Sequence, residues 1–284
     1  MRIGDAWRQA SRCIDRLDAR LLLEHVCRCT HADLIAHPER EMSVEQVTQF
    51  DGLVGRRESG EPLAYLVGSA WFCDLEFAVT TAVLIPRPDT EVLVDVAVEK
   101  ARTLDSPAVV DLGTGSGIVA ILIARLCPQA QVTAVDVSNA ALDVAHANAQ
   151  RHGVNIRFLE GDWYEPLAGE RFDIIVSNPP YVAEGDPHLQ QNGLPFEPQR
   201  ALTDGVAGGN GLACIRSIIA GAAGHLRTGG WLLMEHGYDQ AVEVSRLLVE
   251  AGFADVASWK DGASIERVSG GKVPGAGTMC GSNR

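Results

Sequence analysis

The sequence lacks any apolar run that approaches the length of about 18 residues that a membrane-spanning helix needs. It also lacks a charged leader followed by an apolar core at its start. Both absences predict a soluble cytoplasmic protein without a membrane partner. No two of its seven cysteines form a C-x-x-C pair, and the nearest two, Cys27 and Cys29, have no matching Cys or His pair elsewhere. This pattern argues against a zinc site, so we expect reduced thiols and no metal.

Positive charge is also scarce, with 24 Lys and Arg residues against 37 Asp and Glu residues and a net charge of −13. Nucleic-acid binding draws most of its affinity from phosphate contacts, which this charge opposes. A local basic patch would still be compatible with the composition. With 46% hydrophobic residues in 284, the chain can bury a large core, and we expect a large and a small domain without internal repeats.

Residues 1–75 are predicted to form a small helical domain that docks a partner. Apolar residues recur there near helical spacing, at Ile3, Trp7, Ile14, Leu17, Leu21 and Leu22. Ser43 and Gln46 match the capping-box pattern at the start of a helix that should end near Gly60. No motif typical of catalysis appears before residue 60.

Residues 76–106 are predicted to be a linker that contains a hairpin and a turn. The two prolines of IPRPDTE forbid a central strand and favour an extended turn before a helix near Glu91.

From residue 107 to 270 short apolar runs alternate with helical patterns. The runs PAVVDL, QVTAVDVS, IRFLEGD, FDIIVSN and WLLMEHG read as strands, and ADVASWK and ASIERVSG flank a turn at Asp261 and Gly262. The pattern predicts an α/β fold, with a mainly parallel, Rossmann-like sheet covered by helices on both faces and an antiparallel edge strand. The glycine-rich residues 271–284 are predicted to be a flexible tail.

A glycine loop follows the first strand of this sheet, and its members are Gly113, Thr114, Gly115, Ser116 and Gly117. Ligands of open α/β sheets bind beyond the carboxyl ends of the strands, and glycine lets the backbone approach them closely. The dinucleotide fingerprint would need a glycine at position 118, where Ile118 stands, and no lysine followed by Ser or Thr marks a phosphate loop. The order D-x-G-x-G-x-G instead resembles the first motif of S-adenosylmethionine-dependent methyltransferases.

Two residues at the ends of the next strands fit the same cofactor. Asp136 ends the second strand, where a carboxylate accepts two hydrogen bonds from ribose hydroxyls. Its alternative role is a charge at a helix N-terminus. Trp163 follows the third strand, where adenine would lie against an aromatic wall, although packing in the core explains a tryptophan there equally well.

The fourth strand ends in Asn178, Pro179, Pro180 and Tyr181, beside the first strand and the expected methyl group. The Asn178 side-chain oxygen and the Pro179 carbonyl are two acceptors that suit the two hydrogens of a planar NH₂ group. The prolines restrict the backbone and add no competing donor, and Tyr181 offers a flat face for stacking.

These four residues predict methyl transfer to an amide or aromatic amine. The lone pair of such a nitrogen is delocalised, so it must be oriented toward the methyl group, which supplies up to about 7–11 kcal/mol of a barrier. Aligned dipoles stabilise the charge that develops on the nitrogen. A sulfonium leaves without acid assistance and the surplus proton passes to solvent, so we assign no general base.

Nearly the whole chain resembles the peptide chain release factor N5-glutamine methyltransferases, a family of class I methyltransferases. Besides DLGTGSG, AVDVS, GDW and SNPPYV, the resemblance rests on EPLAYLVG at 61–68, IPRPDTE at 85–91 and FEPQRAL at 196–202. Two departures are Asp89, where relatives commonly have Glu, and Asn210, where Asp is usual.

The resemblance implies a seven-stranded sheet and methylation of the glutamine in the Gly-Gly-Gln motif of bacterial class I release factors, which supports translation termination. It implies that residues 1–75 contact the release factor. Separately, we expect the protein to be a monomer. The resemblance places the cofactor S-adenosylmethionine, and the product S-adenosylhomocysteine, against residues 113–117, Asp136, Trp163 and Asn178. It places the substrate amide against residues 178–181, with Arg87 and Glu91 shaping the pocket.

Two other functions remain open on the sequence alone. An adenine or guanine amino methyltransferase acting on DNA or RNA would use the same acceptor pair on a flipped base. The net charge and the lack of a basic, aromatic-rich segment weigh against it. A non-catalytic module that retains the cofactor fold is the third possibility, which the intact Asn178 and glycine loop disfavour.

Overall fold

The computed structural model describes residues 1–275, and residues 276–284 lie outside the described part of the chain. The chain divides into two compact units. Unit 1 comprises Met1–Ser69 with Pro187–Phe196, and unit 2 comprises Ala70–Asp186 with the chain from Glu197 onward. The first unit therefore ends before the expected residue 75 and also takes in a segment from the middle of the predicted methyltransferase region. Within residues 1–275 no helix combines the length and the apolar character required to cross a bilayer.

Unit 1 is helical. Its elements are α1 (Ile3–Ala10), α2 (Arg16–Cys27), α3 (His31–Ala36), α4 (Val44–Glu58), α5 (Leu63–Val67) and the 3₁₀ helices η3 (Pro187–Gln190) and η4 (Leu194–Phe196). Leu22, Leu23 and Phe50 are among the side chains at its centre. The Ser43 hydroxyl accepts a bond from the Gln46 N–H and the Gln46 side chain accepts from the Ser43 N–H, so the predicted capping box is confirmed.

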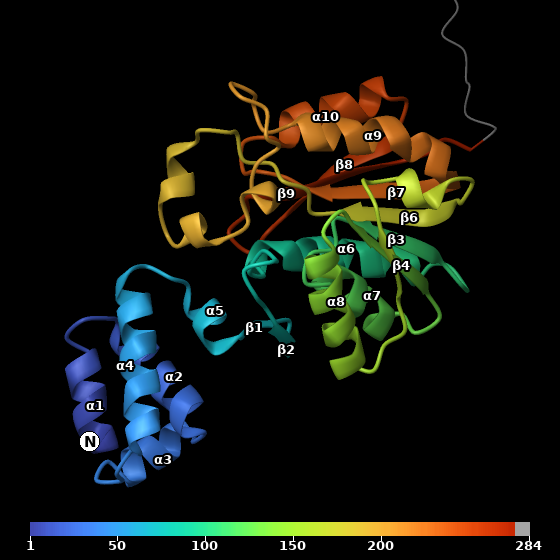
Figure 1. Cartoon of the computed structure of the whole chain (residues 1–284). Coiled ribbons are helices and arrows are strands. Elements are labelled where there is room, and N and C mark those ends of the chain that lie inside the picture. Colours follow the sequence, from blue (N-terminus) through green and yellow to red (C-terminus); the bar gives the residue numbers. More distant parts are fainter. Residues whose placement is uncertain (276–284) are drawn as a thin grey trace, which may run out of the picture. The chain divides into compact units, whose positions relative to one another are not determined.

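Unit 2 is built on a seven-stranded sheet with the strand order β5-β4-β3-β6-β7-β9-β8 (Figure 1). The strands are β3 (Ala108–Leu112), β4 (Gln131–Asp136), β5 (Arg157–Glu160), β6 (Phe172–Ser177), β7 (Leu226–Glu235), β8 (Ala254–Lys260) and β9 (Glu266–Lys272). The first five run parallel, and β9 is antiparallel to both of its neighbours. The class I methyltransferase fold is thus confirmed, with the reversed strand β9 one position in from the edge.

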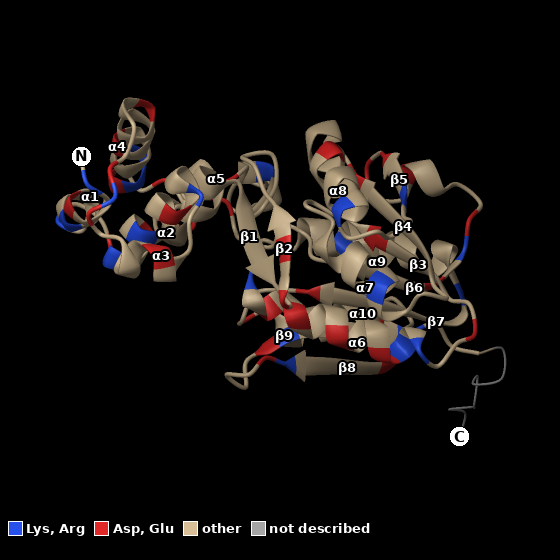
Figure 2. Cartoon of the chain, turned by 90° about the horizontal axis from the view of Figure 1, so that it is seen from below, with Lys and Arg blue, Asp and Glu red and all other residues tan. Residues whose placement is uncertain are grey.

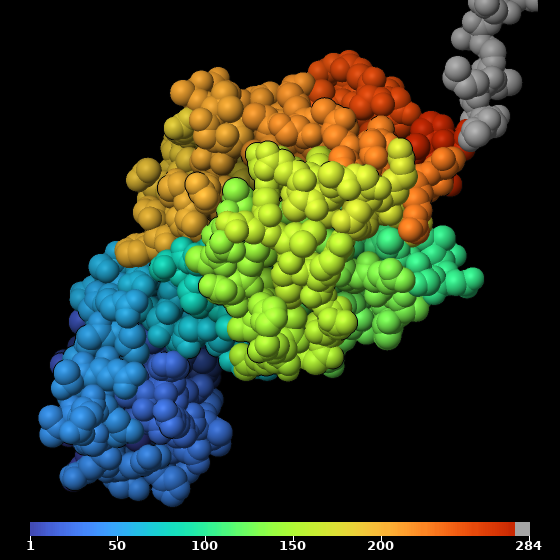
Figure 3. Space-filling model, turned by 45° about the vertical axis from the view of Figure 1, so that its right-hand side comes forward, coloured from blue at the N-terminus to red at the C-terminus, as the bar shows by residue number. Residues whose placement is uncertain are grey.

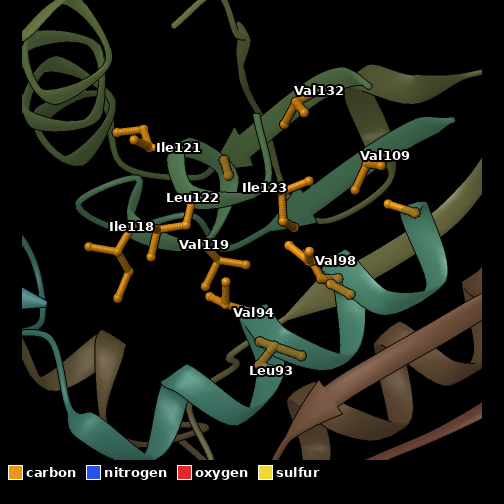
Figure 4. Close-up of a cluster of buried hydrophobic side chains, with 14 of the residues drawn as sticks. Leu93, Val94, Val98, Val109, Ile118, Val119, Ile121, Leu122, Ile123 and Val132 are labelled. Carbon is orange, nitrogen blue, oxygen red and sulfur yellow. The ribbon is translucent and has the colours of Figure 1, made fainter. Parts of the chain in front are cut away.

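Helices cover both faces of this sheet, because its strands are apolar on both sides. They are α6 (Glu91–Ala101), α7 (Ile118–Leu126), α8 (Asn139–Arg151), α9 (Ala213–His225), α10 (Ala241–Glu250) and the 3₁₀ helices η1 (Pro88–Thr90), η2 (Glu165–Leu167) and η5 (Gln199–Ala201). Apolar side chains of α6 and α7 meet over β3 and β4 on one face (Figure 4). On the other face α9 and α10 pack on the sheet, and their side chains form the surface there (Figure 3).

Two predicted segments differ from the structure. The hairpin consists of β1 (Ser69–Phe72) and β2 (Leu75–Ala78), so it begins before residue 76. Residues 91–101 are not part of a linker, because α6 contributes fully buried side chains such as Leu93 and Ala97 to the core of unit 2. The predicted tail also begins too early, since Gly271 and Lys272 pair with β7 as the end of β9. The rest of that prediction, residues 276–284, lies outside the described residues.

Candidate active site

A cavity of about 630 Å³ opens at the carboxyl ends of the parallel strands of unit 2. Most of the residues singled out in the sequence line it, namely Gly113, Thr114, Gly115, Ser116, Asp136, Trp163, Asn178 and Pro180. Segments that are far apart in the chain therefore meet around one space, as the sheet topology requires. Gly117, Pro179 and Tyr181 do not belong to the lining.

The glycine loop turns sharply between β3 and α7. Gly113, Gly115 and Gly117 have φ values of +73°, +55° and +84°, which favour glycine. A Cβ on Gly115 would meet nothing within 4 Å, so this residue faces open space. A Cβ on Gly117 would lie 3.1 Å from the Cβ of Ala145, so Gly117 allows the loop to pack on α8. The first two glycines thus shape the cavity and the third supports it from behind.

Asp136 is held firmly at the end of β4. Its Oδ2 accepts from the Gly115 N–H and its Oδ1 accepts from the Ser138 N–H, each at 2.9 Å. Burial raises the pKa of Asp136, while these N–H groups and the positive charge of Arg200 oppose the rise. Because each oxygen keeps a free lone pair, the carboxylate is able to accept two further hydrogen bonds. Trp163 lies against the glycine loop, because its ring is 3.4 Å from the position that a Cβ on Gly113 would occupy.

A second carboxyl group in the wall, Asp111, was not singled out from the sequence as a site residue. It is 2% exposed and accepts a 2.6 Å hydrogen bond from the Thr114 hydroxyl. Burial raises its pKa to about 7, against the lowering effect of that bond. Its position as the first residue of D-x-G-x-G-x-G is the signal that could have revealed it.

Asn178 stands at the tip of β6, next to the end of β3, because Ser177 pairs with Leu112. The Nδ2 of the Asn178 carboxamide donates a 3.1 Å hydrogen bond to the Thr90 hydroxyl oxygen. The amide nitrogen is thereby engaged within the protein, and the carbonyl oxygen remains available as an acceptor. Thr90 also lines the cavity and was not predicted. It belongs to the motif IPRPDTE and is 1% exposed.

Tyr181 turns away from this cavity and into the protein. Its hydroxyl donates to Glu235 Oε1 at 3.2 Å, and its backbone carbonyl accepts from Gln240 Nε2 at 3.0 Å. Its ring packs against the core cluster beneath α9 and α10. A Cβ on Gly211 would lie only 2.1 Å from the Tyr181 carbonyl oxygen, so a glycine is required there. The predicted stacking of an amide on Tyr181 does not fit this position, because the ring is already packed. Pro179 is buried outside the lining as well.

An ion pair joins the IPRPDTE turn, which was predicted to shape the pocket, to the FEPQRAL segment. Arg87 lines the cavity and pairs with Glu197, which is 3% exposed and also accepts from the Ile85 N–H at 3.0 Å. Arg200, three residues further on, lines the cavity too. Glu91 begins α6 and does not line it. Within residues 1–275 no group of three or more His, Cys, Asp or Glu side chains is arranged to hold a metal ion.

Comparisons with known families match both parts of the chain. Residues 6–68 match the PrmC N-terminal domain, and residues 88–192 match the methyltransferase small domain. Among similar proteins are three that are named release factor glutamine methyltransferase. The protein of Xylella fastidiosa (strain Temecula1) is 48% identical over 94% of this chain and 96% of its own. That of Bordetella pertussis is 50% identical over 91% and 95%, and that of Escherichia coli (strain K12) is 43% identical over 90% and 92%.

Solved structures with similar folds share little sequence with this chain. The hMettl16 catalytic domain, solved with an RNA hairpin, has a TM-score of 0.56 and 14% identity, covering 91% of this chain and 94% of its own. The Thermus thermophilus 16S rRNA N2 G1207 methyltransferase, solved with AdoMet and guanosine, has a TM-score of 0.52 and 22% identity, covering 72% and 49%. At these identities the likeness concerns the methyltransferase fold alone.

Proposed function

The chain belongs to the release factor glutamine methyltransferase family, and we propose that it methylates the side-chain amide nitrogen of the Gly-Gly-Gln glutamine of class I release factors. Similar proteins with this name match more than nine-tenths of the chain at up to 50% identity. The observation in the structure that carries the proposal is Asn178, whose carbonyl oxygen is left free beside a cavity fit for a nucleoside. The methyl donor is S-adenosylmethionine, and the product is S-adenosylhomocysteine.

The residues around the cavity fit this cofactor. Gly113 and Gly115 keep one wall free of side chains, and Asp136 has an acceptor position on each oxygen for two ribose hydroxyls. Trp163 offers an aromatic wall to the adenine, and Thr114 and Ser116 add polar groups along the loop. When bound, the cofactor supplies an electrophilic methyl group on a sulfonium. Gly117 has a supporting part, because it holds the loop against α8.

The substrate amide would be held by acceptors at the tip of β6. The Asn178 Oδ1 and the Pro179 carbonyl would accept one N–H each, while Pro180 narrows the wall of the cavity. Holding both hydrogens turns the nitrogen lone pair toward the methyl group, and orientation of this kind is worth up to about 7–11 kcal/mol. The acceptors also stabilise the positive charge that develops on the nitrogen. Tyr181 lies outside the cavity lining and fixes the end of the Asn178–Tyr181 segment through its hydrogen bonds with Glu235 and Gln240.

The lining of the cavity also includes residues of the family motifs IPRPDTE and FEPQRAL. Arg87 forms an ion pair with Glu197, so IPRPDTE and FEPQRAL hold each other in place beside the cavity. We propose that these residues shape the entrance for the glutamine side chain, with Glu91 acting only through α6. Unit 1, by its match to the PrmC N-terminal domain, is proposed to dock the release factor.

The nucleic-acid alternative has less support. An exocyclic amino group of a flipped base would fit the same acceptors. However, the named relatives act on a release factor, and the net charge of −13 opposes binding to phosphates. Lys and Arg positions are interspersed with Asp and Glu positions along the described residues (Figure 2). A non-catalytic module is disfavoured because the polar groups of Asp136 and Asn178 remain positioned around the cavity.

Mass spectrometry of a purified class I release factor after incubation with the enzyme and S-adenosylmethionine tests the function. We expect one added methyl group on the peptide that contains Gly-Gly-Gln, and none when the glutamine of that motif is replaced by asparagine. A duplex DNA and a structured RNA in the same reaction should remain at the background level. Equal labelling of nucleic acid and release factor would contradict the proposed substrate.

A further inference from the structure

A buried carboxyl group stands directly behind the tip of β6. Glu235 is the last residue of β7, and because Ser177 pairs with Met234, it lies level with Asn178 on the neighbouring strand. It is 1% exposed and does not line the cavity. No step in the transfer of the methyl group uses it, so its presence in the core calls for an explanation.

Two hydroxyl groups face this carboxylate. The Tyr181 hydroxyl donates to Oε1 at 3.2 Å, and the Thr90 hydroxyl lies close enough to lower the pKa of Glu235. Within the described part of the chain Oε2 has no hydrogen-bond partner by distance and angle. An ion pair between Arg267 Nη2 and Asp89 Oδ2, at 2.9 Å, lies nearby. The carboxylate is therefore an acceptor with unused capacity beside the hydroxyl groups of Tyr181 and Thr90.

Thr90 connects this carboxylate to Asn178. A hydroxyl group has one proton to give and two lone pairs that accept. As long as Glu235 is ionised it only accepts, so we expect the Thr90 proton to turn toward its unpartnered Oε2. The Thr90 oxygen then accepts, and it receives the Asn178 Nδ2–H at 3.1 Å. The orientation of the Thr90 hydroxyl, and with it that of the Asn178 carboxamide, would thus follow from the charge of Glu235.

The direction matters because the two ends of a carboxamide are nearly equal in shape and opposite in polarity. If the group behind Thr90 were a donor, Thr90 could accept from it and donate to Asn178. The Asn178 carboxamide would then turn over, and its NH₂ group would face the NH₂ group of the substrate. Donor would meet donor at the point where the reaction needs an acceptor.

We propose that Glu235 is a positioning residue that, through Thr90, holds the Asn178 carboxamide with its carbonyl oxygen toward the substrate nitrogen. The inference rests on the proposed function, because it explains how the acceptor of that reaction is oriented. Tyr181 belongs to the same network, and its contact with Glu235 accounts for a tyrosine that faces away from the cavity.

The network should make the reaction sensitive to pH. Burial raises the pKa of Glu235 to about 7, with Asp89 adding to the rise and the hydroxyls and Arg267 opposing it. Asp89 and Thr90 belong to η1, Tyr181 follows β6, and Arg267 belongs to β9. When pH falls through about 7, Glu235 gains a proton and becomes a donor, so kcat should decline on the acid side.

Three variants separate this role from simple packing. Glu235→Gln keeps the shape but introduces a donor, and Thr90→Val keeps the shape but removes the hydroxyl. Thr90→Ser restores the hydroxyl and serves as the matched control. At saturating release factor we expect Glu235→Gln and Thr90→Val to lower kcat by about 10- to 10²-fold. This loss is no larger than the one that follows removal of a preorganised group in a catalytic site. Thr90→Ser should retain most of kcat, and the Kd for S-adenosylhomocysteine should stay within several-fold in all three.

The double variant and the pH profile provide the sharper tests. If Glu235 acts through Thr90, combining Glu235→Gln with Thr90→Val should cost no more kcat than Thr90→Val alone. The acid-side decline of the wild-type protein should disappear in Thr90→Val. Losses that multiply in the double variant, or an acid-side decline that Thr90→Val retains, would overturn the inference even if Glu235→Gln proved too unstable to assay.

An NMR measurement makes the inference independent of the substrate. The side-chain NH₂ signals of Asn178, assigned by their loss in Asn178→Asp, should shift as the wild-type protein is titrated through pH about 7 and should not shift in Glu235→Gln. If the Asn178 signals of the wild-type protein did not shift during this titration, the positioning role would be refuted. If the wild-type protein did not methylate a release factor, the proposed function would be refuted instead. The NMR titration would still decide whether Glu235 orients Asn178.

Discussion

Replacing Asp136 by asparagine should weaken cofactor binding strongly while leaving the fold in place. In the structure the two carboxylate oxygens each accept one backbone N–H, from Gly115 and from Ser138. An asparagine has only one oxygen, so its NH₂ group must face one of these N–H donors. The remaining oxygen can hold the backbone or a ribose hydroxyl well, but it cannot replace both acceptors of the carboxylate.

The size of the effect follows from the bonds lost. A hydrogen bond to a charged group contributes about 1.5–3 kcal/mol, and at least one such bond to the ribose disappears. At about 1.4 kcal/mol for each tenfold change, Kd should rise by about 10- to 150-fold. Because one backbone N–H loses its acceptor, the stability of the fold should fall by a further ~1–3 kcal/mol. The removal of a buried charge partly offsets this loss.

Calorimetric titration with S-adenosylhomocysteine, together with thermal unfolding, measures both quantities. The matched control is Asp173→Asn, since Asp173 accepts the Ala108 N–H at 2.8 Å at the opposite end of the sheet. The control should lose stability and bind the ligand with unchanged Kd. If folded Asp136→Asn bound within twofold of the wild-type protein, the proposed ribose contact would be refuted.

Three further substitutions test other parts of the site. Gly117→Ala adds a Cβ 3.1 Å from that of Ala145 at a φ of +84°, so thermal unfolding should show a loss of at least ~1–2 kcal/mol; an unchanged Tm would contradict the packing role. The pKa of Asp111 is raised from 3.8 to about 7, so between these values the native state binds more protons than the unfolded state, and stability falls as pH rises. Asp111→Asn should remove up to about 4 kcal/mol of this pH-dependent loss of unfolding free energy, as measured by denaturant titrations at several pH values. If the unfolding free energy of the variant depended on pH as steeply as that of the wild-type protein, the raised pKa of Asp111 would be excluded. Glu197→Gln keeps an acceptor for the Ile85 N–H but loses the charge paired with Arg87, which should cost ~1–3 kcal/mol; a variant as stable as the wild-type protein would show that the ion pair contributes nothing.

The sheet could be predicted because its strands are short apolar runs whose ends carry turn residues. The run before Gly113 and the run before Asn178 became the adjacent strands β3 and β6, and the Asp261 turn became the β8–β9 hairpin. Local patterns of this kind need no knowledge of distant residues. The cavity followed from the same reasoning, because the ends of parallel strands converge.

Long-range contacts explain what the sequence did not reveal. Residues 91–101 follow two prolines and resembled part of a linker, yet α6 packs into the core. The segment Pro187–Phe196 clusters with unit 1, which no local pattern indicates. Thr90 and Glu235 are unremarkable in the sequence, and only the pairing of β6 with β7 brings them behind Asn178. The contact of Tyr181 with Glu235 depends on the same pairing.

The central claim is that Asn178 orients the nucleophilic nitrogen, and single-turnover methylation of a release factor by Asn178→Ala tests it most directly. With saturating S-adenosylmethionine, we expect the rate to fall by on the order of 10²-fold or more. The Kd for S-adenosylhomocysteine should remain within several-fold of the wild-type value, because the glycine loop and Asp136 are untouched. An undiminished rate of methyl transfer in this variant would contradict the account.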